Sequence, residues 1–161
     1  MSDNAWTLAA APNGAFVVET PCAQADIISL RRVPDSAIAN VTFAPDSRVI
    51  CRRGKIMLLA GEVDLPAVPA AGRSFFDQFV ESIKGDETAE GTPAATTING
   101  HRAFTNRQVA NGVVAQTGFV ELSRSKIIML LAGAEENSGM SVAEQGMIVD
   151  RFYASVKVVR K

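Results

Sequence analysis

A short apolar phrase occurs twice in this chain, and the repetition constrains the fold more than any other feature. Lys55–Gly61 reads KIMLLAG, and Lys126–Gly133 reads KIIMLLAG, with one inserted residue. Each copy is followed, after a loop, by a second match: Asp77–Lys84 reads DQFVESIK and Asp150–Lys157 reads DRFYASVK. Two matches in the same order and at nearly the same offset indicate an internal duplication of one structural unit.

The unit predicted in each copy is a hairpin, a loop and a helix. Ile56–Leu59 and Ile127–Leu131 are apolar at every position, which favours a strand buried on both faces, although periodicity alone leaves a buried helix open. The Arg-Gly-Lys and Arg-Ser-Lys triplets around the start of the two phrases are typical of tight turns. We therefore expect residues 49–84 and 120–157 to superpose as equivalent units.

The helices are predicted from apolar stripes that follow each phrase at helical spacing. Ser74–Asp77 and Ser141–Glu144 have the form of capping boxes, in which a side-chain oxygen satisfies a free amide at the start of a helix. The stripes consist of Phe75, Phe76, Phe79, Val80 and Ile83 in the first copy and of Ile148, Val149, Phe152, Tyr153 and Val156 in the second.

Strand-like runs and turn signals fill most of the remaining chain. Asn99-Gly100 and Asn111-Gly112 suit type I′ hairpin turns, because both residues of such a pair tolerate a positive φ. Apolar strands and two amphipathic helices predict an α+β fold, with a central, mainly antiparallel sheet covered by helices on its faces (an α/β/α sandwich). The other expected segments are strands at Phe16–Thr20, Ile27–Arg32 and Val156–Val159, a meander of about four strands over Thr96–Leu131, a long loop over Pro34–Asp46 and an exposed connector over Gly85–Ala94.

Length and composition fit a single domain. The 161 residues are interpreted as a partly ordered leader, residues 1–13, followed by one domain, residues 14–161. The formal charge of −1 offers no general attraction to nucleic acid or to an anionic membrane. The longest apolar runs fall far short of the roughly 20 residues that span a bilayer. The composition does not indicate an oligomeric state.

The first residues contain neither a basic segment nor an apolar segment of the kind that makes up a signal peptide. Two locations follow from this. The protein is cytoplasmic, or it is periplasmic or extracellular and its signal peptide has been removed.

Three stretches resemble the Mog1/PsbP-like α/β/α sandwich superfamily, and the resemblance covers about residues 14–159. They are the first strand, Phe16–Pro21 (FVVETP), the turn and strand at Asn99–Phe104 (NGHRAF), and the helix end at Phe152–Val158 (FYASVKV). The resemblance implies a mostly non-enzymatic protein, since some members bind a small GTPase, some assist photosystem II, and many bacterial members are exported proteins without an assigned role. No surface motif links this chain to the first two groups, so the bacterial branch is the expectation.

The two cysteines carry the most testable chemistry. Cys22 directly follows the first strand, and Cys51 lies in the strand before the first apolar phrase. They are either two small buried hydrophobic residues in a reducing cytosol or one disulfide that joins the first strand to the sheet in an oxidising compartment. Their spacing is not that of a metal site.

Catalytic constellations are weak in this sequence. His101 is the only histidine, and its place after an Asn-Gly turn is typical of a solvated hairpin residue. A serine triad would have to be built around it, and no Gly-x-Ser-x-Gly elbow supports one. No glycine-rich loop suits a phosphate group. We therefore predict no catalytic residue, no cofactor and no metal.

Charged pairs mark several strand ends. The acidic pairs are expected to be solvated, or else to converge on a cation; the basic pairs are expected to face water, or else to form a basic patch. These pairs are Glu62 and Asp64, Glu135 and Glu136, Arg31 and Arg32, and Arg52 and Arg53.

Three classes of function remain from the sequence. The leading one is a non-enzymatic accessory or binding protein with a protein partner of unknown identity. The alternative is a protein that binds a small ligand or lipid in a cleft between sheet and helix, which requires a sizeable apolar cavity. An enzyme would need His101 or an acidic pair in a pocket with a shifted pKa.

Overall fold

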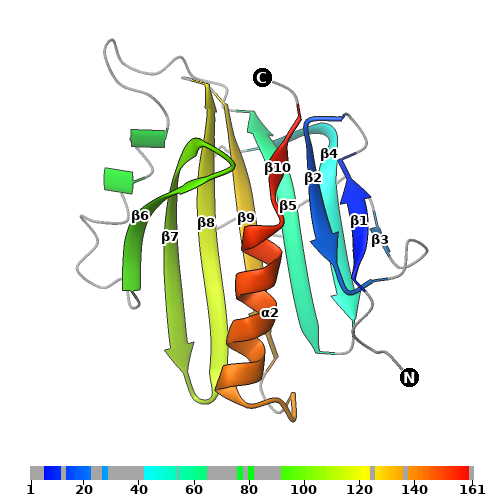
Figure 1. The fold of residues 1–161 in the computed structure, drawn as a ribbon, viewed down its shortest axis with the longest axis vertical. Helices are drawn as coiled ribbons and strands as arrows, with labels where there is room; N and C mark the ends of the chain where they lie inside the picture. Colours follow the sequence, from blue (N-terminus) through cyan, green and yellow to red (C-terminus); the bar gives the residue numbers. More distant parts are fainter. Residues whose placement is uncertain are drawn as a thin grey trace.

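A seven-stranded antiparallel sheet is the centre of the structure, with the strand order β3-β4-β5-β9-β8-β7-β6 (Figure 1). The computed structural model describes residues 6–11, 14–22, 27–28, 42–53, 55–64, 76–77, 80–81, 92–123, 126–135 and 138–159. The strands of this sheet are β3 (Ile27–Ile28), β4 (Thr42–Arg53), β5 (Ile56–Asp64), β6 (Thr92–Ile98), β7 (His101–Ala110), β8 (Val113–Ser123) and β9 (Lys126–Ala134).

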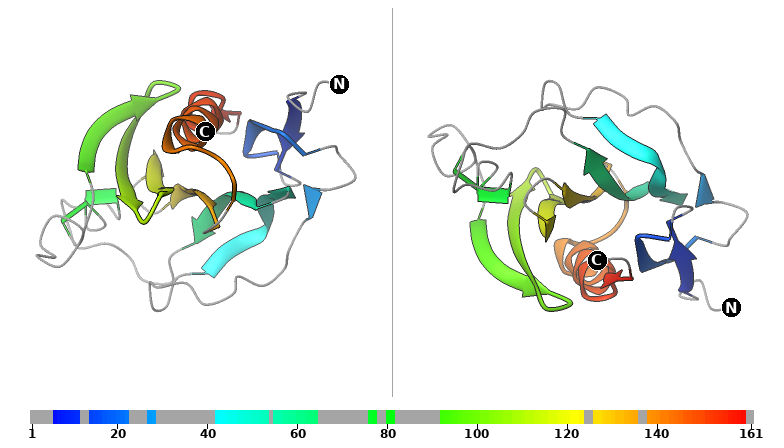
Figure 2. Two further views of the ribbon diagram at one scale, coloured as in Figure 1. Left: turned by 90° about the horizontal axis from the view of Figure 1, so that it is seen from below. Right: turned by 90° about the horizontal axis from the view of Figure 1, so that it is seen from above.

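A second layer covers one face of this sheet. It consists of a three-stranded sheet in the order β1-β2-β10 and of helix α2 (Figure 2). The strands are β1 (Thr7–Ala10), β2 (Phe16–Thr20) and β10 (Lys157–Val158), and α2 spans Val142–Ala154. Strand β1 thus lies within the segment that the sequence assigned to a partly ordered leader. Strand β10 pairs with β2, so the two ends of the domain meet.

The two apolar phrases lie side by side as strands at the centre of the sheet. They form β5 and β9, which pair antiparallel with Leu59 opposite Leu131 and Met57 opposite Gly133. Gly61 lies opposite Met129, so a methionine–glycine pair flanks the Leu59–Leu131 pair on each side. The register is therefore two-fold symmetric about an axis normal to the sheet.

The duplication is present in the hairpins, and it does not extend to the helices. Hairpins β4–β5 and β8–β9 are equivalent by this axis. An axis normal to the sheet keeps the two faces distinct, so equivalent helices would lie on the same face. Instead, α2 packs on one face, whereas Phe76, which is helical together with Asp77, packs on the other. The prediction that residues 49–84 and 120–157 superpose as whole units is wrong for this reason.

The fold is α+β and mainly β in its described part. Helix α2 is the one helix there with defined bounds, and on the opposite face only residues 76–77 and 80–81 are described as helical. The predicted sandwich with helices on both faces is therefore corrected to a sheet whose one face is covered jointly by α2 and a small sheet. Sequence reasoning missed β1, so it could not anticipate that a second sheet would replace a helix.

Other predictions differ in detail. The expected loop at Pro34–Asp46 is wrong from Thr42 onward, because strand β4 begins there and has a register shift between Phe43 and Arg48. The expected connector is wrong at Thr92, where β6 begins. The strand expected over Ile27–Arg32 is described only at its first two residues, and the capping box at Ser74 lies outside the described residues.

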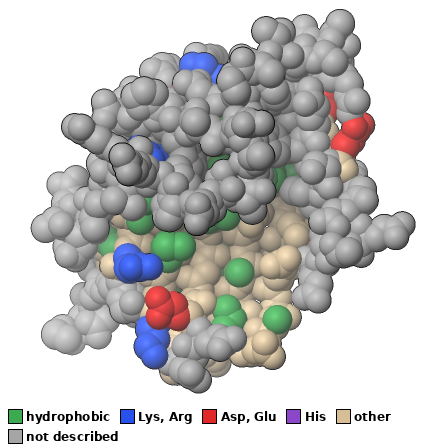
Figure 3. Space-filling view, turned by 180° about the vertical axis from the view of Figure 1, so that it is seen from behind, with side chains coloured by type: hydrophobic (Ala, Val, Ile, Leu, Met, Phe, Trp, Pro, Cys, Tyr) green, Lys and Arg blue, Asp and Glu red, His purple; other side chains and the backbone are tan. Residues whose placement is uncertain are grey.

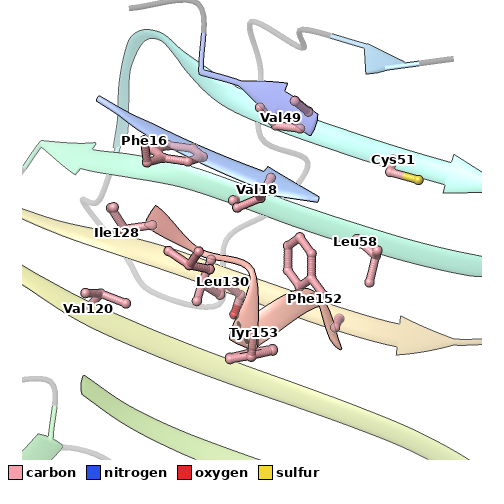
Figure 4. Packing of buried hydrophobic residues seen from close by; sticks show 14 of the residues in the cluster. Phe16, Val18, Val49, Cys51, Leu58, Val120, Ile128, Leu130, Phe152 and Tyr153 are labelled. Carbon is pink, nitrogen blue, oxygen red and sulfur yellow. Dashed lines mark hydrogen bonds between the residues drawn. The ribbon is translucent and has the colours of Figure 1, made fainter. Parts of the chain in front are cut away.

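Packing on the covered face accounts for most of the core. Leu58 and Leu130 are buried there against α2 and the small sheet, and Figure 4 shows Phe16 and Phe152 lying over the strands. On the opposite face, Leu59 is buried and Leu131 is half-buried, where full burial was expected for both. Both faces of β5 and β9 therefore carry apolar contacts, as the unbroken apolar phrases predict.

One tyrosine fixes the height of α2 above the sheet. The Tyr153 hydroxyl donates to the carbonyl oxygen of Gln116 at 2.9 Å and lies 3.1 Å from that of Leu130. Its ring lies over Gly118, where an added Cβ would meet the ring carbon Cε2 at 2.6 Å. Burial raises the pKa of Tyr153 well above its usual range, so the hydroxyl keeps its proton.

Gly118→Ala should destabilise the protein by about 1–3 kcal/mol, because the added methyl group must displace the Tyr153 ring and with it the helix. Gly146→Ala is the matched control: it lies within α2, and its added Cβ would meet only Arg107 Nη1, at 3.7 Å. This control should stabilise by about 0.5–1 kcal/mol, since glycine in a helix loses more backbone freedom than alanine. Urea unfolding measures both, and equal effects would contradict the packing described.

Candidate functional site

The disulfide between Cys22 and Cys51 joins the two sheets. It connects the residues after β2 to β4, with Cα atoms 5.8 Å apart, and the pair is the one that the sequence singled out. The Thr7 hydroxyl donates to the carbonyl oxygen of Cys22 at 2.6 Å, so β1 is fixed to the same point. This connection positions the residues at the start of the domain, including Trp6, against the rest of the fold.

A groove of about 340 Å³ lies between Trp6 and the outer face of α2. Trp6 forms one wall, with its ring partly packed against the core. The Arg151 guanidinium carbon lies 4.5 Å from the centre of this ring, within the range of a cation–π contact. Met147 and Ile148 supply the apolar lining from the helix, and Glu144 adds a carboxylate.

The sequence of α2 determines which side chains reach the groove. Ser141 caps the helix by accepting from the Glu144 amide at 3.1 Å, as its capping box predicts. Gln145 is buried and holds the helix to the β7–β8 turn: its Oε1 accepts from the Val114 amide and its Nε2 donates to the carbonyl oxygen of Gly112, both at 2.8 Å. With Gln145 facing inward, Met147 faces outward.

The groove includes an exposed apolar side chain. Met147 is 71% exposed. Isolated apolar residues on a surface need no explanation, but Met147 lines a hollow of which the ring of Trp6 forms one wall. The arrangement offers apolar contact with charged groups of both signs at its rim.

Sequence reasoning missed this site. Trp6 was assigned to a partly ordered leader, because residues 1–13 are small and polar apart from Trp6 and Leu8. Met147 lies off the predicted helix stripe, and an apolar residue on the polar face of an amphipathic helix is the signal that was available.

His101 is half-buried rather than solvated as expected. Its Nδ1 lies 3.0 Å from the carbonyl oxygen of Glu121, a contact that orients the imidazole ring. In the part of the chain that is described, no group of three or more histidine, cysteine or acidic side chains could hold a metal ion.

The acidic pairs do not converge. Glu62 and Glu135 lie toward opposite ends of the antiparallel pair β5–β9. Glu62 is buried, which contradicts the expectation of a solvated strand end, and its Oε1 lies 3.4 Å from Lys126 Nζ. The reason is that the strand was expected to end at Leu59, whereas β5 continues past Glu62 to Asp64.

Glu135 instead lies near a basic side chain. It lines a surface hollow of about 160 Å³ together with Arg52 and Lys55. The mixture of signs does not form the basic patch that was considered for the arginine pairs, and Arg31, Arg32 and Glu136 are outside the described residues. Figure 3 shows the sheet face opposite α2, where the described charges of both signs are likewise mixed.

A charged group also ties the described helical residues to the sheet. Arg102 donates to Glu121 at 2.7 Å and to Asp77 at 3.2 Å, and it lies over the ring of Phe76. The hydrogen bond to Glu121 is the main cause that raises the pKa of Arg102. These contacts are exposed and orient the segment rather than form a site.

The cavity that the described residues form between the sheet and α2 is small. The cavity there is about 10 Å³ and is lined mainly by apolar side chains such as Leu58 and Val149. Ligand sites usually measure roughly 300–1,000 Å³. No helix in the described ranges is both long and apolar enough to cross a membrane.

Fold and groove together define an α+β, mainly β protein with an open apolar groove on its helical side. No family model matches the chain, and no curated protein matches it. Among solved structures, the chain is similar to LpqN of Mycobacterium tuberculosis, described as involved in cell envelope biogenesis. The two share 12% identity, the match covers 97% of this chain and 91% of that chain, and the TM-score is 0.45. A likeness at this level does not define a family or an activity.

The contact between Arg151 and Trp6 makes a prediction of its own. Arg151→Ala should uncover the Trp6 ring, shift its fluorescence to longer wavelength and cost about 0.5–1 kcal/mol of stability. Because the chain contains one tryptophan, the emission reports this groove alone. Arg52→Ala, a change of the same kind at an exposed residue of β4, should leave the emission unchanged.

Proposed function

We propose that this protein is a non-enzymatic accessory protein that binds a protein partner through the groove between Trp6 and α2. The observation that carries the proposal is the composition of that groove. Aromatic residues, methionine and arginine are the types enriched in protein interfaces, and Trp6, Met147 and Arg151 line one hollow. The partner would insert an apolar side chain over Met147, and its polar groups would meet Arg151 and Glu144.

Membership of the Mog1/PsbP-like superfamily, in its bacterial branch, is part of this proposal. It is supported by the motifs at the first strand, at Asn99–Phe104 and at the end of α2. A binding role is what that resemblance implies.

The alternative, a small-ligand or lipid protein that uses a cleft between sheet and helix, is less well supported. Its cleft would have to open from about 10 Å³ to accept a ligand. The residues that line this cavity are buried or half-buried, whereas Met147 in the groove is 71% exposed.

Export from the cytoplasm is the second part of the proposal, and the disulfide supports it. Disulfides persist in the periplasm and outside the cell and are rare in the cytosol. A periplasmic or extracellular location follows.

Protein trapped with an alkylating agent in its native compartment should contain no free thiol. Reduction should then cost about 3.5 kcal/mol, the loop-closure value for the 29-residue separation, and should expose the amides of β2 to exchange before those of β8. Hydrogen exchange with mass spectrometry measures the order. Two free thiols in the native compartment would contradict export.

The binding site is tested by capture with matched variants. A partner retained from the native cell extract should lose about tenfold or more in affinity for Met147→Glu, because a charge would be placed in the apolar groove. Val109→Glu is the control. Val109 is also exposed, at 56%, but it lies near the C-terminal end of β7 and does not line the groove. Partners retained equally by both variants would refute the site.

A further inference from the structure

Strand β6 forms an open edge of the large sheet. It pairs with β7, and in the described part of the chain no strand pairs with its other side. Its residues from Pro93 to Thr97 are all exposed. Figure 1 shows β6 at the side of the sheet away from β4 and the small sheet.

The register of the β6–β7 hairpin identifies the backbone groups at this edge. The turn at Asn99 and Gly100 has positive φ at both residues, so Ile98 and His101 close the hairpin and exchange both hydrogen bonds. Hydrogen-bonded pairs alternate along the strand, so Thr96 also bonds to β7. The amide and carbonyl groups of Ala95 and Thr97 therefore point away from the sheet.

The edge has little of the protection that natural sheets place on such strands. Thr92–Ile98 contains no charged residue, no lysine and no register shift. Pro93 removes one amide near the start of the strand. Beyond it, Ala95 and Thr97 offer a complete set of donors and acceptors for another strand.

We propose that β6 pairs antiparallel with β6 of a second copy of this chain, and that the two large sheets join into one. A two-fold axis normal to the sheet would pass between the two Thr96 residues. Ala95 of each copy would then exchange both of its hydrogen bonds with Thr97 of the other. All of the outward groups of Ala95 and Thr97 are satisfied in this register.

The register centred on Ala95 is poorer, because it would place Thr97 opposite Pro93. Proline has no amide hydrogen, so the Thr97 carbonyl would have no donor. The register centred on Thr96 also places the two Thr96 side chains opposite each other and Ile98 opposite Ala94 on the same face. Thr–Thr and apolar cross-strand pairs are favourable, and no like charges meet.

The chemistry of this edge favours pairing with a second copy of the chain over pairing with a strand of another protein. The strand is uncharged, so two identical strands do not repel one another. Its hydrogen-bonding groups are complementary to themselves under the two-fold axis. Trp6 and Met147 take no part, so this interface is independent of the proposed binding groove.

Cysteine trapping tests the register. In a non-hydrogen-bonded antiparallel pair the Cα atoms lie about 4.5 Å apart, which is within reach of a disulfide. Thr96→Cys should therefore form a covalent dimer under mild oxidation at least about tenfold faster than Ala94→Cys or Val109→Cys. Non-reducing electrophoresis, with the Cys22–Cys51 bridge verified by peptide mapping, measures the rates. Equal rates in all three variants would overturn the proposal.

Sedimentation equilibrium tests the pairing without added thiols. The mass of the unmodified protein should rise with concentration from 17.1 kDa toward twice that value. Ala95→Pro removes an amide that β7 does not use, so this variant should keep its circular dichroism spectrum and remain at the monomer mass. A constant monomer mass up to millimolar concentration, or an Ala95→Pro variant that associates as well as the unmodified protein, would refute the dimer.

Discussion

The antiparallel pairing of β5 with β9 is the contact on which the rest of the structure depends. The two strands lie at the centre of the large sheet, and both bury apolar side chains on both of their faces. A strand of this kind is stable only if each face is covered. On one face that requirement is met by α2 together with the small sheet, and the disulfide from Cys22 to Cys51 holds the small sheet in place.

The local features of the sequence predicted the local structure well. The unbroken apolar phrases became paired strands, Asn99-Gly100 and Asn111-Gly112 became turns with positive φ, and Ser141 capped α2. The arrangement of the helices was beyond the sequence. An internal match indicates that two segments share a local structure, but it does not show on which face of the sheet each helix packs. That choice is made by contacts between distant residues, such as Tyr153 over Gly118.

The candidate site was hidden for a related reason. Trp6 becomes part of a wall only because β1 pairs with β2, β2 is tied to β4 by the disulfide, and Arg151 then lies over the ring. The sequence singled out the two cysteines, but it showed neither the pairing of β1 with β2 nor the contact of Arg151 with Trp6. Met147 was visible as an apolar residue on a polar helix face, yet a single such residue does not define a groove until its neighbours across space are known.

The symmetry of the central pair also bears on how the proposed groove and the proposed dimer would work together. A two-fold axis normal to a sheet keeps its faces distinct, both for β5 and β9 within the chain and for two β6 strands between chains. In the proposed dimer, both copies of α2 would therefore lie on the same side of the joined sheet. Two grooves on one side can engage a partner that presents two binding segments, and the second contact then becomes intramolecular. Pairing through an axis along the strands would have required parallel β6 strands and would have placed the grooves on opposite sides. The direction in which the two β6 strands pair thus determines whether the proposed dimer can be bivalent.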